Sequence, residues 1–180
     1  MLRALAARPL LIGVLAMTAV VLASNILVQH LLGDWLTWGA LTYTVAFLIT
    51  DVTNRALGPA AARRVVAAGF LAGVLASLVA AGMGATTLRI AVGSGLAFLA
   101  AQLLDVAVFD RLRAGRWWRA PLVSSLIGSA SDTALFFTIA FSAALAATAD
   151  VEWANVAVPL LGAGPEAPLW VSLALADFAV

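Results

Sequence analysis

Long apolar stretches dominate this chain, and they constrain its fold more than any other feature. Five of them, each about twenty residues or longer, cover residues 9–32, 38–57, 65–83, 88–109 and 121–148. About 20 helical residues, each adding ~1.5 Å, cross the ~30 Å hydrocarbon core of a bilayer. A sixth apolar stretch, 168–180, is too short to cross as a helix, so we interpret it as an incomplete span. The sequence predicts an all-α polytopic transmembrane helix bundle of six spans, forming a single transmembrane domain over residues 1–180.

The composition agrees with a membrane protein. Hydrophobic residues make up 64% of the chain and charged residues 11%, and the mean hydropathy of +1.07 lies outside the range of water-soluble domains. A net charge of +1 does not indicate nucleic-acid binding. The chain has no cysteine and one histidine, His30, which excludes disulfides, thiolate metal sites and a histidine-rich metal site. We therefore expect the lipid bilayer as a partner, and neither a nucleic acid nor a cofactor.

The distribution of arginine predicts the orientation. The ten basic residues are all arginines, and nine of them lie near the N-terminus, in 55–64 or in 111–119. If the chain crosses the membrane at each predicted span, these three segments fall on one side and Arg89 falls near the other. Segments rich in basic residues remain in the cytoplasm. The prediction is a cytoplasmic N-terminus, with residues 149–167 on the outer side.

Aspartates interrupt the apolar stretches. Asp51, Asp105, Asp132 and Asp177 each lie in a different stretch. A carboxylate at the centre of a membrane helix costs roughly 2.5–3.5 kcal/mol on insertion scales. Ionisable residues in such helices usually face the bundle interior and mark a pathway for a substrate or an ion. We therefore predict a polar internal site for a molecule that enters the membrane.

Polar neighbours accompany two of these aspartates, near the predicted cytoplasmic ends of their spans. Asn54 and Arg55 follow Asp51 at i+3 and i+4, so the three side chains share a helix face. This group is either a helix-end ion pair or part of the site, and both interpretations stay open. Gln102 and Asp105 lie one turn apart on one face of the fourth span, where two polar side chains need partners or a ligand.

Asp132 is the strongest candidate for a ligand contact. It lies about 16 Å along a helix from the start of the fifth span, and therefore near mid-bilayer, with Phe136 one turn further on the same face. Asn25 and Gln29 form a polar i,i+4 pair on the first span. Arg89 could bond lipid headgroups or close over an internal carboxylate. The predicted substrate-binding residues are Asn25, Asp51, Arg89, Gln102, Asp105, Asp132, Phe136 and Asp177.

Signatures of known intramembrane enzymes do not fit this sequence. The segment "AVGSGLAF" has Val92 two residues before Ser94, where rhomboid proteases have glycine. The Gly-x-Gly-Asp motif of aspartyl intramembrane proteases does not occur, and neither does a Walker glycine loop. We expect no enzyme activity, and no ATP hydrolysis by this chain itself.

Three segments carry a family resemblance. They are "TYTVAFLITDVTNRALG" (42–58), "RIAVGSGLAFLAAQLLDVAVFDRLR" (89–113) and "WWRAPLVSSLIGSASDTALFFTIAF" (117–141). In this order and at this spacing they resemble the queuosine precursor transporters of the vitamin-uptake group, which is similar to the energy-coupling-factor (ECF) transporters. The segment "ALADF" near the end of the chain fits the sixth span of that family.

The resemblance implies a transporter that imports queuosine precursors, 7-deazaguanine-type bases, across the bacterial inner membrane. A guanine-like edge presents adjacent N–H donors that one carboxylate, Asp132 or Asp105, can accept, while Gln102 and Asn25 take the carbonyl side and phenylalanines stack on the ring. The alternative is an ECF-type substrate-binding subunit that requires a separate ATPase module. A structural scaffold without ligand is a third interpretation. A homo-oligomer and an ECF-type energising module both stay open as partners.

Overall fold

Six α-helices form most of the protein in the computed structural model, which describes residues 2–27, 30–32, 36–145 and 149–179. They are α1 (Leu2–Leu27), α2 (Trp38–Leu57), α3 (Pro59–Gly82), α4 (Leu88–Leu112), α5 (Arg119–Phe141) and α6 (Leu169–Phe178). The strands β1 (Leu31–Leu32) and β2 (Leu36–Thr37) lie between α1 and α2. After α5 come a 3-10 helix (Ala149–Asn155), β3 (Ala157–Pro159), a second 3-10 helix (Leu160–Gly162) and β4 (Glu166–Pro168).

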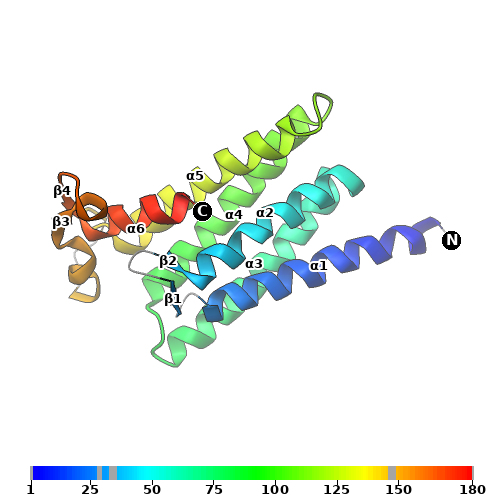
Figure 1. Cartoon of the computed structure of the whole chain (residues 1–180). Coiled ribbons are helices and arrows are strands. Elements are labelled where there is room, and N and C mark those ends of the chain that lie inside the picture. Colours follow the sequence, from blue (N-terminus) through cyan, green and yellow to red (C-terminus); the bar gives the residue numbers. More distant parts are fainter. Residues whose placement is uncertain (1, 28–29, 33–35, 146–148, 180) are drawn as a thin grey trace.

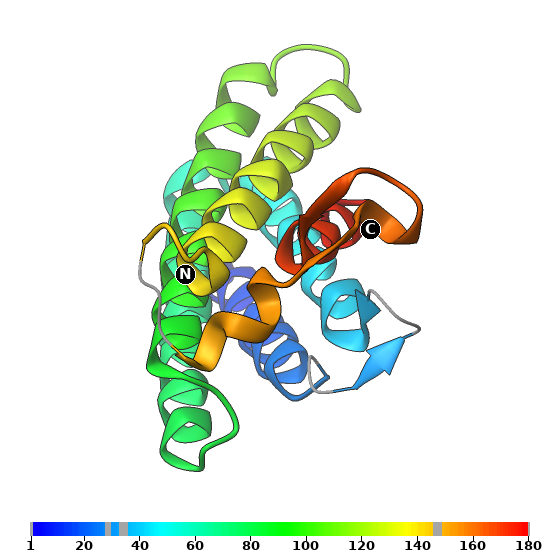
Figure 2. The same ribbon diagram turned by 90° about the vertical axis from the view of Figure 1, so that its left-hand side faces the viewer.

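The five long helices lie side by side, and the short α6 packs against α5 (Figures 1 and 2). One end of the bundle holds the N-terminus, the α2–α3 junction and the α4–α5 connection, and the other end holds the β1–β2 and β3–β4 hairpins (Figure 1). Arg55 donates to the backbone carbonyl of Trp117 at 2.8 Å, and Arg113 donates to that of Arg55 at 3.4 Å. The three arginine-rich segments of the sequence therefore gather at the same end.

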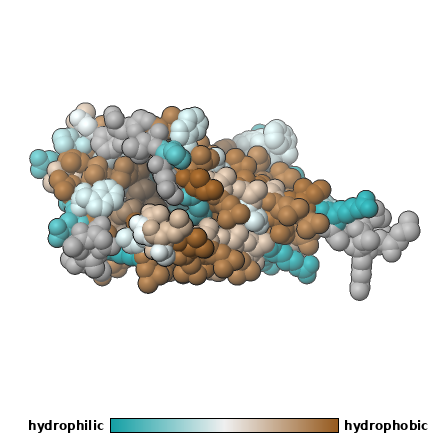
Figure 3. Space-filling view, turned by 90° about the horizontal axis from the view of Figure 1, so that it is seen from below, coloured by the Kyte–Doolittle hydropathy of each residue, from teal (hydrophilic) through white to brown (hydrophobic). Residues whose placement is uncertain are grey.

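The surface of the bundle is apolar, as expected for lipid contact. Among the described residues, four helices are long and apolar enough to cross a membrane: Arg8–Leu27 within α1, and α3, α4 and α5. Ile12, Leu75 and Leu126 are each more than half exposed. Hydrophobic side chains cover the middle of the molecule in Figure 3, and hydrophilic ones lie mainly towards its ends. The predicted all-α membrane helix bundle is confirmed.

The number of spans and the N-terminal side remain predictions, as does the single transmembrane domain. α2 has 20 residues, but Asp51, Asn54 and Arg55 make it less apolar than the four helices above. Its most polar face is turned inward, because Thr50, Asp51 and Asn54 are all buried. α2 therefore presents a polar face to the interior of the bundle and an apolar face, with Val45, Leu48 and Val52, to its surface.

Two helices are shorter than the apolar stretches that predicted them. α1 ends at Leu27 rather than at residue 32, and Leu31–Leu32 pairs with Leu36–Thr37 in a small antiparallel hairpin. α5 ends at Phe141 rather than at residue 148, because the backbone becomes extended after it. The carbonyl of Phe141 accepts a hydrogen bond of 2.8 Å from the side chain of Asn155. Apolar composition continues past both helix ends, so hydropathy alone could not locate them.

α3 begins at Pro59, before the predicted start at residue 65. Gly58 has φ 84°, a conformation that residues with a Cβ rarely adopt. Pro59 lies in the first turn of α3, where a missing N–H donor costs nothing. A single non-helical residue thus joins α2 to α3 and holds the two helices as antiparallel neighbours.

α4 and α5 form a closely packed hairpin, and glycines permit the close approach. A Cβ added at Gly93 on α4 would lie 3.3 Å from the side chain of Ile139. A Cβ added at Gly128 on α5 would lie 3.3 Å from the Cβ of Asp105 and 2.7 Å from the ring of Phe47 on α2. Small residues allow membrane helices to approach in this way. Gly128 therefore lies where α2, α4 and α5 meet.

Candidate substrate-binding site

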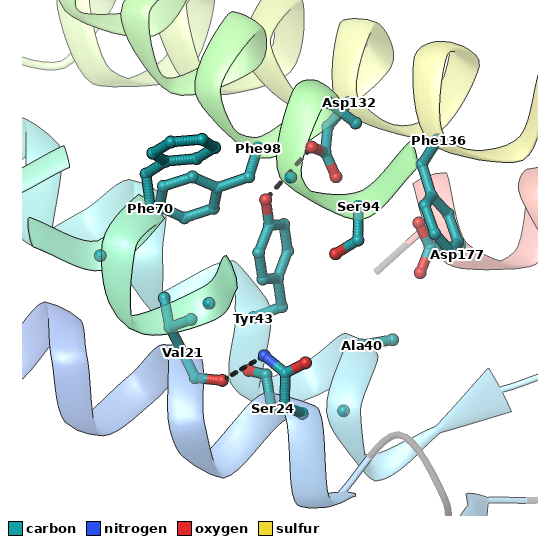
Figure 4. Close-up of a pocket in the computed structure, with 16 residues that line it drawn as sticks. Val21, Ser24, Ala40, Tyr43, Phe70, Ser94, Phe98, Asp132, Phe136 and Asp177 are labelled. Carbon is teal, nitrogen blue, oxygen red and sulfur yellow. Dashed lines mark hydrogen bonds between the residues drawn. The ribbon is translucent and has the colours of Figure 1, made fainter. Parts of the chain in front are cut away.

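A cavity of about 150 Å³ lies inside the half of the bundle that carries β1 and β2 (Figure 4). A cavity of this size can admit a benzene-sized molecule. All six helices contribute to its wall. The lining residues are Val21, Ser24 and Asn25 of α1, Gly39, Ala40 and Tyr43 of α2, Gly69, Phe70 and Gly73 of α3, Ser94, Gly95, Ala97 and Phe98 of α4, Asp132 and Phe136 of α5, and Asp177 of α6.

Tyr43 and Asp132 form the central polar contact of the cavity. The Tyr43 hydroxyl donates a hydrogen bond of 3.1 Å to Oδ1 of Asp132. Edge-on contacts with Phe47 and Phe98 hold the tyrosine ring, at centroid distances of 6.2 and 6.0 Å. In the described part of the chain, Oδ2 of Asp132 accepts no hydrogen bond. One oxygen of this carboxylate is therefore oriented by the protein, and the other is available to a ligand.

Asp177 places a second carboxylate on the same cavity. Its Oδ2 accepts a hydrogen bond of 3.1 Å from the Thr133 hydroxyl, which ties α6 to α5. None of the lining residues in the described structure is basic. The cavity is therefore rich in acceptors, and it suits a ligand that carries several N–H donors.

Aromatic rings lie on opposite sides of this space. Phe70 and Phe98 lie beside Tyr43, while Phe136 lies across the cavity near Asp177 (Figure 4). Such rings can stack on a planar ligand whose edge bonds to a carboxylate. The arrangement thus combines flat apolar walls with a polar edge.

Asn25 lines the cavity from α1. Its Nδ2 donates to the carbonyl of Val21 at 2.9 Å, and its Oδ1 accepts from the Ser77 hydroxyl at 3.4 Å. These two bonds orient the amide and leave one N–H of Nδ2 for a further acceptor. Gln29, the predicted partner of Asn25, lies outside the described residues.

The predicted site residues fall into two groups in space. Those that line the cavity are Asn25, Asp132, Phe136 and Asp177. Those that lie elsewhere are Asp51, Arg89, Gln102 and Asp105. Sequence reasoning did not select Tyr43, although it is the only tyrosine of the chain and occurs in an apolar stretch. A phenol in a membrane helix needs a hydrogen-bond partner, and that requirement was a usable signal.

A second group of polar side chains lies on α2, α4 and α5, closer than the cavity to the arginine-rich end of the bundle. We call it the Asp51–Asp105 cluster. Its members are Thr50, Asp51, Asn54, Gln102, Asp105, Ser124 and Ser125. Asp51 accepts hydrogen bonds from Ser124 at 3.2 Å and from Ser125 at 3.1 Å, while Thr50 donates to Gln102 at 2.6 Å. The cluster is separate from the cavity, because the cavity wall includes none of its members.

The helix-end ion pair considered for Asp51 and Arg55 is not formed. In the described part of the chain the salt bridge is between Asp110 and Arg113, at 3.2 Å. The Arg55 guanidinium lies 5.1 Å from the ring centroid of Phe109 and also donates to a backbone carbonyl of the α4–α5 connection. Asp51 is turned inward and hydroxyls bind it instead.

Arg89 binds the end of α5. Its Nε donates to the carbonyl of Ile139 at 2.7 Å and its terminal nitrogen to that of Ser142 at 2.6 Å. The last carbonyls of a helix lack helical partners, and a basic side chain can satisfy them. Arg89 therefore joins the start of α4 to the end of α5.

Comparison with known proteins identifies the family of this chain. Residues 37–161 match the family model described as "Putative vitamin uptake transporter". The chain belongs to this transporter family. The region that matches the family model includes Tyr43 and Asp132. It also includes Asp51 and Asp105. The chain is accordingly a membrane transporter of a small molecule.

Two relatives of this family member carry more specific names. It is 39% identical to a protein named "Queuosine precursor transporter" from Escherichia coli (strain K12), over 77% of this chain and 72% of that protein. It is also 39% identical to a protein named "Probable queuosine precursor transporter" from Haemophilus influenzae (strain ATCC 51907 / DSM 11121 / KW20 / Rd), over 58% of this chain and 52% of that protein. No solved structure matches the chain. The resemblance to queuosine precursor transporters is confirmed.

Proposed function

We propose that this chain imports queuosine precursors, which are 7-deazaguanine-type bases, across the bacterial inner membrane as a multi-pass protein. The names of the two relatives support this substrate class. The observation that carries the proposal is the Tyr43–Asp132 pair in a cavity to which all six helices contribute. A site built from every helix can change shape when the helices move, as transport requires.

The chemistry of the cavity suits a guanine-like base. Such a base presents an N–H and an exocyclic NH₂ side by side, and the available oxygen of Asp132 can accept from them. Phe98 and Phe136 lie on opposite sides of the space and can stack on the ring. Asn25 and Ser94 can each donate to the carbonyl oxygen of the base.

The electrostatics of the cavity favour particular substrates. Asp132 and Asp177 both line it, and its wall carries no basic side chain among the described residues. An anionic base would meet like charge, which disfavours binding. We therefore expect the cavity to bind neutral or cationic bases in preference to anionic ones.

The proposed orientation has a cytoplasmic N-terminus. The arginine-rich segments gather at one end of the bundle, and positively charged segments remain in the cytoplasm (Figure 1). The cavity lies in the opposite half, near β1 and β2. In this orientation the cavity lies in the outer half of the bundle, on the side from which an imported base arrives.

Complementation tests the proposal. The chain is expressed in bacteria that can neither make queuosine precursors nor import them, a precursor base is supplied at low concentration, and queuosine in tRNA is measured. We expect queuosine to appear with the wild-type chain and with Asp110→Asn, which alters an exposed ion pair at the far end of α4. Normal membrane abundance without queuosine in tRNA would contradict the proposed substrate.

A second assay separates a self-sufficient transporter from an ECF-type binding subunit. The purified chain is placed in vesicles without ATP or any ATPase, and both binding and uptake of the base are measured. Uptake supports the transporter. Binding without uptake would instead favour a subunit that needs an energising module.

A further inference from the structure

Asp51 and Asp105 form a buried pair of carboxyl groups that the substrate cavity does not use. Asp51 is 5% exposed and Asp105 is 0% exposed. Their side chains, one on α2 and the other on α4, are close neighbours in the interior of the bundle, where α5 also meets both helices. Two carboxylates in such contact cannot both stay ionised, because like charges repel strongly where water is excluded.

The hydrogen bonds around the pair satisfy one carboxyl group only. Asp51 accepts from Ser124 at one oxygen and from Ser125 at the other. Both oxygens of Asp105 are buried, and no residue in the described structure donates to them. An ionised carboxylate in that position would cost several kcal/mol. A proton on one of the two groups removes this cost, because the protonated carboxyl donates a hydrogen bond to the other.

Two more buried groups beside the pair lack partners. Nε2 of Gln102 and Oδ1 of Asn54 have no hydrogen bond among the described residues, and both side chains are 0% exposed. Gln102 lies one turn before Asp105 on α4, and Asn54 lies one turn after Asp51 on α2. Together with the two carboxyls, these groups make the interior of the bundle polar at this level of α2 and α4.

The charged surroundings of the pair are few. Among the described residues, Arg55 on α2 is the basic group that acts on it, and it does so from outside salt-bridge distance. α5 contributes the hydroxyls of Ser124 and Ser125 rather than a charge. With one proton the pair carries a charge of about −1, which Arg55 offsets, and without it the charge is about −2.

The pair and the substrate cavity share three helices. Tyr43 and Asp51 lie on α2, Phe98 and Asp105 on α4, and Asp132 on the same helix as the two serines. Along each helix the separation is seven or eight residues, or about 11 Å. A movement of these helices that closes or opens the cavity must therefore also change the contact between the two carboxyl groups.

We propose that Asp51 and Asp105 hold one exchangeable proton between them, and that this proton moves with the substrate and couples uptake to the proton gradient. The coupling rests on the transport function proposed above. The proton enters the pair from the outer aqueous phase with the helices in one arrangement. It leaves to the cytoplasm after the base has been released, and no other chemical group changes.

Infrared spectroscopy tests the proton site without any substrate. The pH-dependent C=O stretching band of a protonated carboxylic acid is recorded for the full chain in lipid. Asp105→Asn should remove one such band and the control Asp110→Asn should not. Ser125→Ala keeps both carboxyls but removes a donor to Asp51, so the pH dependence of the band should change. An Asp105→Asn spectrum identical to wild type overturns the proposal, and so does an unchanged titration in Ser125→Ala if Asp105→Asn does not fold.

Vesicles with an imposed pH gradient test the coupling. With one proton per base and the membrane potential held at zero, a gradient of one pH unit can drive accumulation up to about tenfold. Asp105→Asn should lose this accumulation, while the affinity for the base, set in the cavity, changes far less. Accumulation that ignores the pH gradient, or follows a sodium gradient, overturns the coupling. If wild type does not bind a 7-deazaguanine base at all, the proposed function fails, and the infrared result still decides the proton site.

Discussion

Tyr43 on α2 donates a hydrogen bond of 3.1 Å to Asp132 on α5, across 89 positions of sequence. The bond uses one oxygen of the carboxylate and fixes the direction of the other. Tyr43 is thus a positioning residue for Asp132, and its own ring is held by Phe47 and Phe98. The geometry of the site consequently depends on how α2, α4 and α5 pack.

Tyr43→Phe tests this positioning role. The ring contacts remain but the hydroxyl is lost, so we expect binding of the base to weaken by about three- to tenfold, or ~0.5–1.5 kcal/mol. The measurement is a binding isotherm with purified protein. Thr44→Val is the matched control, because Thr44 is exposed and its hydroxyl bonds within its own helix. Equal affinities for wild type and Tyr43→Phe would remove the tyrosine from the site.

Asp132→Asn should have a larger effect on the ligand. The amide presents an NH₂ group to the donors of the base and loses the negative charge. Loss of one charge-assisted hydrogen bond is worth roughly 1.5–3 kcal/mol, or about ten- to a hundredfold in affinity. Uptake at low substrate concentration and membrane abundance are measured in the same cells. Normal uptake at normal abundance would show that Asp132 does not contact the substrate, whereas low abundance would indicate a structural role.

Gly128→Ala should disturb the meeting point of α2, α4 and α5. The added Cβ would lie 2.7 Å from the ring of Phe47, so the helices must separate slightly. Overpacking of this kind costs about 1–3 kcal/mol. We expect a lower melting temperature in detergent than for Gly82→Ala, where nothing lies within 4 Å of the new Cβ. Equal melting temperatures would mean that the helices adjust without cost.

Arg89→Met distinguishes two roles of this arginine. Its bonds to the carbonyls of Ile139 and Ser142 predict a loss of stability of about 1–3 kcal/mol with little change in affinity for the base. Thermal unfolding and binding are both measured, and Arg64→Met, at an exposed position on α3, is the control. A loss of affinity at unchanged stability would instead support a role for Arg89 in closing over the substrate.

The orientation can be checked with reporters. A reporter fused after Arg113 should be cytoplasmic, and one inserted within residues 149–167 should be external, because the arginine-rich segments gather at one end. An external signal after Arg113 would reverse the orientation. It would also place the cavity in the cytoplasmic half.

Several features of the site were readable from the residues alone. Hydropathy defined the membrane bundle, and the cost of a carboxylate in hydrocarbon singled out the four aspartates. Asp132, Phe136, Asn25 and Asp177 were predicted from their types and depths, and all of them line the cavity.

The grouping of these residues, by contrast, was decided by the packing of the helices. Helical periodicity shows which side chains share a face, but it does not show which neighbouring helix that face meets. Asp132 and Asp177 line one cavity because α6 packs on α5, while Asp105 and Asp51 are neighbours because α2, α4 and α5 meet closely at Gly128. Burial in lipid favours every apolar face about equally. Small residues that allow close packing, and hydrogen bonds between helices, therefore decide which aspartates line the cavity and which form the buried pair.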